Sequence, residues 1–187
     1  ALAEVQAASK LDADVPYGSF IEAMFLSDEY LMKGSMSRLK LGGGATSPEL
    51  AEIRRQVRAL LDRGEKARVW GPEGAQDFRA AFQGIDATVS GDAAAAEAPL
   101  ARAIESPDLK AFRVRFLFLR ALARAEREEF DGAMRDLDEV ETAWPEDETV
   151  EGVRAAIRTL RVARIGKGGT LDPNDVKELG EMLALVQ

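Results

Sequence analysis

Two segments of the chain carry the same pattern of small and apolar residues. Residues 91–108 read GDAAAAEAPLARAIESPD, and residues 128–147 read EEFDGAMRDLDEVETAWPED. The matching residues are all separated by 37 positions: Ala96 and Ala133, Leu100 and Leu137, Ala103 and Val140. Spacings of three and four residues place them on one face of a helix. Each segment follows an amphipathic stretch and ends at a proline, so the sequence predicts a repeated helical hairpin.

Other parts of the chain show the same helical period. Phe78, Phe82, Ile85 and Val89 form one stripe at i, i+4, i+7 and i+11. Further helices are predicted from Pro48 to about Arg63, opened by Ser47, from Ser106-Pro107-Asp108 onward, from Thr149 to Ile165, and from Asp172 onward. Strand-like alternating runs rich in Val, Ile or Thr are absent from the sequence. We therefore expect an all-α fold of antiparallel helical hairpins.

The predicted organisation is a single helical domain over residues 1–187. Residues 1–74 would form N-terminal helices, 75–147 two repeats, and 148–187 a C-terminal helical pair that caps the stack. Seven or eight helices are expected. Their turns are predicted near residues 43–47, 64–74, 90–92, 106, 128–129, 145–148 and 166–171. Near the N-terminus, one face of a predicted helix carries Phe20, Met24, Ser27 and Leu31. We expect this helix to be buried.

The repeated segment resembles the tetratricopeptide repeat, a helix–turn–helix module of about 34 residues. Phe130 stands for its turn aromatic, Ala133 for its small residue, and Pro145 for its terminal proline. The resemblance covers residues 78–147, and the flanks continue the rhythm of helical hairpins. The sequence departs from the family pattern in three ways. The spacing is 37 residues, Ala93 occupies the aromatic position of the upstream unit, and Arg120 or Arg124 stands on a first helix where the family usually has an apolar residue. The resemblance implies a short superhelix whose first helices line a concave surface.

Composition excludes several chemistries. The sequence has neither histidine nor cysteine, which rules out zinc sites of the usual type, disulfides, and thiol- or histidine-based catalysis within this chain. The net charge of −8 makes nucleic-acid binding an unfavoured function. No apolar run approaches the roughly 20 residues that span a bilayer. We expect no enzyme activity, no cofactor, no metal and no direct membrane span.

Three short motifs have a simpler interpretation than ligand binding. GKGGT at 166–170 lacks the spacing of a phosphate loop, and GGGATS at 42–47 is typical of a loop followed by a helix cap. LDPNDVKEL at 171–179 departs from the calcium-loop pattern and favours a helix cap. Ala1-Leu2-Ala3 has the small-x-small pattern of a bacterial signal-peptidase site, which favours an exported, periplasmic protein. A trimmed chain, or loss of methionine before alanine, explains the same residues.

Arginine gives the strongest binding signal. Arg154, Arg158 and Arg161 form one helical stripe, and a second stripe on an earlier first helix includes Arg120 and Arg124. If the chain curves as the resemblance implies, both stripes face one groove, where arginines would pair with carboxylates of a partner. The alternative is that they pair with this chain's own acidic residues. Seven acidic residues at 128–141 are interpreted as a solvated helix face.

Two functional hypotheses follow. The first is a non-enzymatic protein–protein interaction module that binds a peptide or a partner helix, acidic in character, in a concave groove. The second is a structural or scaffold subunit of a larger assembly, such as one in the cell envelope, that uses its outer faces and methionine-rich N-terminal helices as permanent contacts. An exposed apolar strip between Met24 and Met36 would favour the second. The sequence identifies neither the partner nor the oligomeric state.

Overall fold

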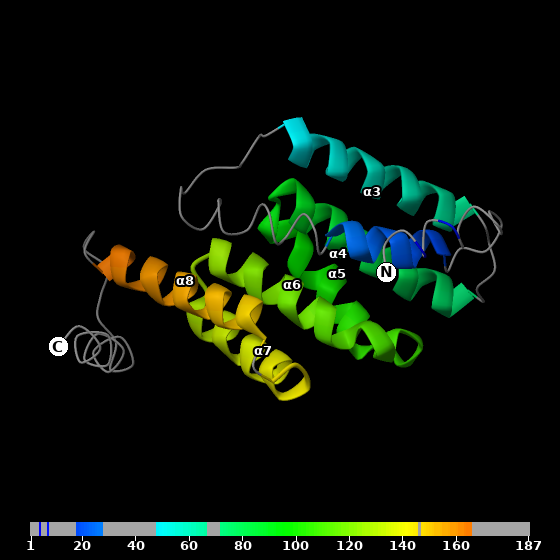
Figure 1. Cartoon of the computed structure of the whole chain (residues 1–187). Helices are drawn as coiled ribbons and strands as arrows, with labels where there is room; N and C mark the ends of the chain where they lie inside the picture. The colour runs from blue at the N-terminus through cyan, green and yellow to red at the C-terminus, as the bar shows by residue number, and fades with distance from the viewer. Residues whose placement is uncertain are drawn as a thin grey trace.

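The computed structural model describes residues 4, 7, 18–27, 48–66, 72–145 and 147–165. In this part of the chain the regular elements are helices (Figure 1). Residues 4 and 7 are helical, and a helix over residues 18–27 follows. After it come α3 (Pro48–Lys66), α4 (Pro72–Ser90), α5 (Ala93–Glu105), the 3-10 helix η1 (Pro107–Phe112), α6 (Arg113–Glu126), α7 (Phe130–Ala143) and α8 (Glu148–Ile165). The prediction of an all-helical fold is confirmed.

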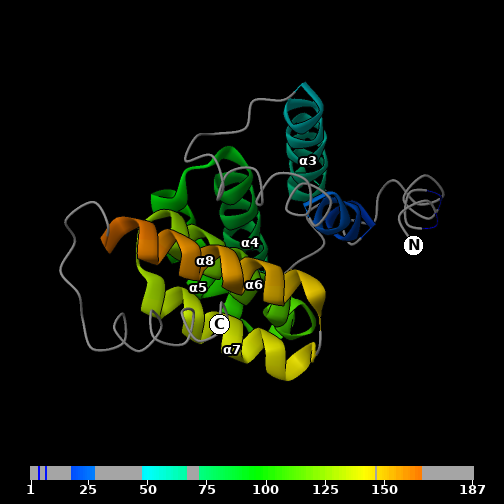
Figure 2. The ribbon, with the colours of Figure 1, turned by 60° about the vertical axis from the view of Figure 1, so that its left-hand side comes forward.

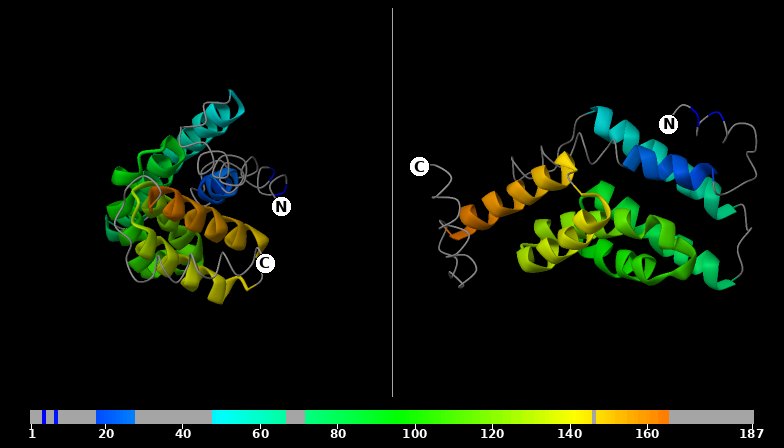
Figure 3. Two further views of the ribbon diagram at one scale, coloured as in Figure 1. Left: turned by 90° about the vertical axis from the view of Figure 1, so that its left-hand side faces the viewer. Right: turned by 60° about the horizontal axis from the view of Figure 1, so that its bottom comes forward.

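Helices that are neighbours in the sequence are also neighbours in space. The most extensive contacts join α4 to α5, α5 to α6, and α6 to α7, whereas α3 meets α4 and α8 meets α7 over smaller areas. Figure 2 shows the helices from a second direction, with α3 at the top and α7 at the bottom. In Figures 1 and 3, α8 lies at one end of the molecule, and α3 with the 18–27 helix lies at the other.

The core confirms the burial that the repeated pattern predicted. All six matched side chains are fully buried: Ala96, Leu100, Ala103, Ala133, Leu137 and Val140. They belong to one hydrophobic cluster that extends from Phe20 to Ile157. One hairpin cannot bury both of its apolar faces, so each obtains its core from the next helix along the chain.

Short turns separate the packed helices. Gly91 has a φ of 76°, a conformation that costs a glycine little, and it ends α4. The Asp92 side chain then accepts a hydrogen bond of 3.1 Å from the Ala95 N–H, which caps α5. Asp147 similarly accepts from the Thr149 N–H at 2.8 Å at the start of α8. The predicted turn near 90–92 is confirmed at Gly91 and Asp92, and the one near 128–129 at Glu128, whose φ is 64°. The chain between Pro145 and Glu148 separates α7 from α8, as predicted.

Some predicted boundaries are wrong. α3 continues to Lys66 instead of ending near Arg63, and α4 starts at Pro72, so both ends of the predicted turn at 64–74 are helical. Ser106-Pro107-Asp108 opens the 3-10 helix η1, and the Ser106 side chain makes no capping hydrogen bond. The chain then changes to α-helix at Phe112, whose φ of −106° and ψ of 0° separate the two helix types. The turns at 43–47 and 166–171 and the helix from Asp172 lie outside the described residues.

Gly84 marks the closest approach of α4 to α5. A Cβ atom at this position would lie 2.7 Å from both Cγ and Cδ2 of Leu100, and 3.2 Å from its backbone nitrogen. Leu100 is itself fully buried, so it has little room to move away. The absence of a side chain at Gly84 is therefore what lets α4 and α5 pack at this distance.

Alanine substitution at two glycines is expected to change stability in opposite directions. Gly84→Ala should destabilise the protein by about 1–3 kcal/mol through overpacking against Leu100. Gly152 lies inside α8, where an added Cβ would meet no other atom within 4 Å. Gly152→Ala should therefore stabilise the protein by up to about 1 kcal/mol through helix propensity. Urea unfolding of both variants measures the difference. Stabilisation by Gly84→Ala would contradict the close approach of α4 and α5.

Candidate functional site: an arginine–carboxylate network around α7

The acidic residues of α7 and its preceding turn are engaged by arginines from the same chain. All seven acidic residues at 128–141 take part. The ion pairs are Glu128 with Arg164, Glu129 with Arg127, Asp131 with Arg161, Asp136 with Arg120 and Arg124, Asp138 and Glu141 with Arg154, and Glu139 with Arg113. The interpretation of this cluster as a solvated face holds for the six exposed members and needs correction at Asp136, which is buried.

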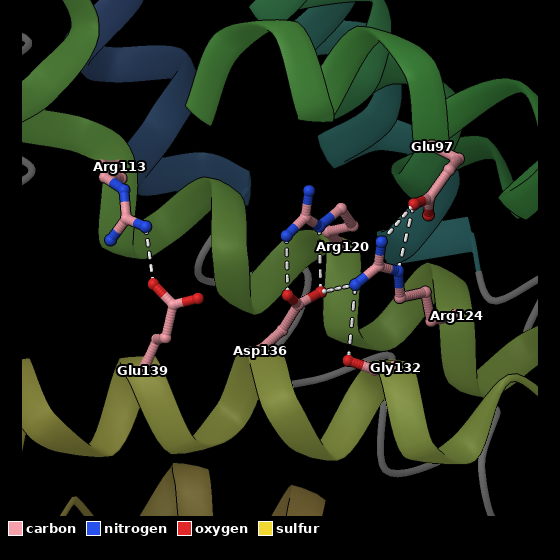
Figure 4. Close-up of polar contacts among 7 residues, drawn as sticks. All are labelled: Glu97, Arg113, Arg120, Arg124, Gly132, Asp136 and Glu139. Carbon is pink, nitrogen blue, oxygen red and sulfur yellow. Dashed lines mark hydrogen bonds and ion pairs between the residues drawn. The ribbon is translucent and has the colours of Figure 1, made fainter. Parts of the chain in front are cut away.

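Asp136 is the centre of the network between α6 and α7 (Figure 4). Arg120 donates from Nε to Oδ2 at 3.0 Å and from Nη2 to Oδ1 at 2.7 Å, which is the paired geometry that a guanidinium forms with a carboxylate. Arg124 donates from Nη1 to Oδ2 at 2.9 Å. The Asp136 side chain is only 3 % exposed. One buried carboxylate therefore accepts three charge-assisted hydrogen bonds.

Arg124 also ties α6 to two other helices. Its Nη2 and Nε donate to Oε1 of Glu97, on α5, at 2.6 and 3.0 Å. Its Nη1 lies 3.4 Å from the carbonyl oxygen of Gly132, on α7. A Cβ at Gly132 would be only 3.1 Å from Cδ of Arg124, so the missing side chain gives the arginine room to pass. Figure 4 shows this arginine between Glu97 and Asp136.

The electrostatics at Arg120 keep its guanidinium charged. Burial lowers the pKa of Arg120, but the hydrogen bonds and charge of Asp136 raise it by more, with smaller contributions from Glu97 and Glu139. The net pKa lies above the usual arginine value. A permanently charged group of this kind holds a carboxylate but does not transfer protons. The arrangement fits positioning and binding better than acid–base chemistry.

Two arginines of α8 are held in the same way on another side of α7. Arg154 donates to Asp138 at 2.8 Å and to Glu141 at 2.9 Å, and its side chain is 8 % exposed. Arg161 donates to Asp131 at 2.8 Å and is 7 % exposed. Their carboxylate partners are about half exposed or more, so each pair has a buried cation and an accessible anion.

Arg158 differs from the other four predicted binding arginines. It lies between Arg154 and Arg161 on the α8 stripe and is partly exposed. Among the described residues it has no ion-pair or hydrogen-bond partner. The structure therefore brings Arg120 with Arg124, and Arg154 with Arg161, onto α7 carboxylates of their own chain. It leaves Arg158 at the edge of that network.

Sequence reasoning missed the two carboxylates that organise the α5–α6–α7 contact. Asp136 lies three residues after Ala133 and four before Val140, so it borders their buried face. An acidic residue at such a position signals a buried partner, because an unpaired charge there would be very costly. Glu97 carries no comparable signal, since its pairing with Arg124 spans 27 residues and depends on the fold.

No family model, curated protein or solved structure matches this chain. The site must therefore be interpreted from its own geometry. In the part of the chain that the structure describes, no helix is both long and apolar enough to cross a bilayer.

Proposed function

We propose that this chain is a non-enzymatic protein-binding module built as a short tetratricopeptide-like array. In this proposal α8 presents Arg158 to a carboxylate of a peptide or helix from another protein. The observation that carries it is the contrast on one stripe: Arg154 and Arg161 are neutralised by α7, whereas Arg158 is partly exposed without such a partner among the described residues. A guanidinium favours planar, paired contacts with carboxylates.

The neighbours of Arg158 support binding of a single acidic group. Arg154 and Arg161 are 8 % and 7 % exposed and pair with α7 carboxylates, so Arg158 is the accessible arginine of this stripe. The same acidic residues that neutralise Arg154 and Arg161 would repel a long run of negative charge. A partner with one or two carboxylates at the contact fits better than a polyanion.

The test of this function is a charge reversal with a matched control. Full-length wild-type protein, Arg158→Glu and Arg135→Glu are used to capture proteins from the source cells, and binding of the captured protein is then measured with purified components. Arg135 is exposed on α7, so its reversal makes the same change of charge at a different place. We expect Arg158→Glu to weaken binding at least about tenfold, the change that 1.4 kcal/mol gives, and Arg135→Glu to have little effect.

Ionic strength provides a second measurement of the same contact. Between about 0.1 M and about 1 M salt the screening length falls from about 10 Å to about 3 Å, so an exposed ion pair weakens. Binding that is insensitive to salt and to Arg158→Glu would contradict the proposal. The structural-subunit hypothesis would then lead, although in the described part of its apolar strip Met24 and Leu26 are buried and Phe25 is only partly exposed.

A further inference from the structure

The helix over residues 18–27 is bound to the rest of the fold like a short amphipathic ligand. Its inward face includes Phe20, Ala23, Met24 and Ser27, at i, i+3, i+4 and i+7, each at most 2 % exposed, and Ser19 and Leu26 are buried beside them. This is the anchor spacing by which an amphipathic helix binds a hydrophobic groove. Ten residues are too few for a stable isolated helix, so its conformation depends on the surface that it covers.

That surface is aromatic and comes from elements far along the chain. The Phe20 ring lies 5.2 Å from Phe78 and 5.4 Å from Phe82, both on α4, and 4.9 Å from Phe112, at the end of η1. Figures 2 and 3 show the 18–27 helix next to α3, whose inward side chains belong to the same hydrophobic cluster. Together α3, α4 and η1 surround an aromatic anchor site, which we call the Phe20 site.

The described contacts across this boundary are almost entirely apolar. The Ser27 hydroxyl donates to the Ala23 carbonyl within its own helix at 2.7 Å, which satisfies it without the rest of the protein. Phe25 adds a contact with the Arg115 guanidinium, 5.2 Å from the ring centroid. Such contacts specify shape and spacing, not a unique sequence. Another helix with an aromatic residue, a small residue and a methionine or leucine at the same spacing would fit.

We propose that the Phe20 site is a groove for an amphipathic helix of a partner protein, and that residues 18–27 occupy it in cis as an autoinhibitory segment. The partner helix carries an aromatic anchor at i, a small residue at i+3 and a methionine or leucine at i+4. A tethered helix competes at an effective concentration on the order of millimolar. The partner therefore gains access only when it binds more tightly than the cis helix or when that helix is weakened.

This inference is independent of the carboxylate contact proposed for Arg158. That contact is electrostatic and lies on α8, whereas the Phe20 site is apolar and lies against α3 and α4. Failure of either proposal therefore leaves the other untouched.

The experiment uses the full chain with a substitution that weakens binding of its own 18–27 helix, and it adds the same helix as a separate peptide. The probe is a fluorescent peptide with the sequence of residues 16–29, and binding is followed by anisotropy to wild-type protein and to Phe20→Asp. We expect the variant to bind the peptide at micromolar concentration. Because the cis helix competes at an effective concentration of about 1 mM, and the peptide binds at about 1 μM, wild-type protein should bind the peptide about 1,000-fold more weakly. A control peptide that itself carries Phe20→Asp should bind neither protein.

Three results would overturn the proposal. One is a folded Phe20→Asp variant, shown by a cooperative melt, that does not bind the peptide. Another is equal binding of the peptide by wild type and variant. The third is a dimer that wild-type protein forms as its concentration rises and that the variant does not form. The Phe20 site would then be occupied by the helix of a second copy of this chain.

Amide hydrogen exchange of the wild-type protein keeps the proposal testable if Phe20→Asp does not fold. A displaceable helix opens locally, so amides in residues 20–27 should exchange at least about tenfold faster than buried amides of α4 such as Ile85. Exchange of both helices at one common rate, set by global unfolding, would show that residues 18–27 are an inseparable part of the core and would overturn the inference.

Discussion

Replacing Asp136 with asparagine should lower the free energy of unfolding more than any other conservative substitution on α7. The substitution keeps the shape but removes the charge that Arg120 and Arg124 share, and those side chains are only 15 % and 20 % exposed. Breaking a buried ion pair from one side costs about 3–5 kcal/mol, because the remaining charge stays desolvated. Chemical denaturation of Asp136→Asn against wild type measures the loss.

Glu139→Gln is the matched control for this experiment. Glu139 also lies on α7 and also pairs with an arginine of α6, but the Glu139 and Arg113 side chains are 50 % and 42 % exposed. Exposed pairs contribute about 0–1 kcal/mol. Equal losses for the two variants would mean that the Asp136 network is as well solvated as the surface pair, which contradicts its burial.

Leu100→Ala should give the second large loss, about 2–5 kcal/mol, because it leaves a cavity at a fully buried position where α5 meets α4. The same change should reverse the effect of an alanine at Gly84. The new methyl at Gly84 would lie 2.7 Å from Cγ and Cδ2 of Leu100, and both of these atoms are removed in the Leu100→Ala background.

A double-mutant cycle at Gly84 and Leu100 tests this reversal by unfolding measurements on the two single variants and the double variant. We expect a coupling of about 1–3 kcal/mol, the size typical of residues in contact. Strictly additive losses would show that the two positions do not touch. Gly152→Ala combined with Leu100→Ala provides the additive reference, since space around Gly152 is open.

The helical fold and its core could be predicted because they depend on local periodicity. The matched pairs Ala96 with Ala133 and Leu100 with Leu137 are apolar at helical spacing, and all four are buried. The cap at Asp92 and the turn at Gly91 follow from local side-chain and backbone chemistry in the same way. The tetratricopeptide-like curvature, in contrast, remains a proposal.

The pairing of charges could not be predicted because it depends on which helix faces which. The sequence identified both arginine stripes, but a stripe alone does not show whether Asp136, 16 residues after Arg120, lies against it or in solvent. The η1 segment escaped prediction for a related reason, since Ser106-Pro107-Asp108 is an equally good start for a 3-10 or an α-helix. In both cases tertiary packing decides among locally equivalent choices.

The bridge that Arg124 makes between Glu97 and Asp136 limits how this chain can change its length over evolution. Arrays of helical hairpins usually gain or lose whole units by duplication or deletion of a segment. Here one side chain joins the α4–α5 hairpin to the α6–α7 hairpin, so a unit inserted at residue 106 would separate Glu97 from Arg124. The two hairpins are therefore expected to be inherited together, as one indivisible block.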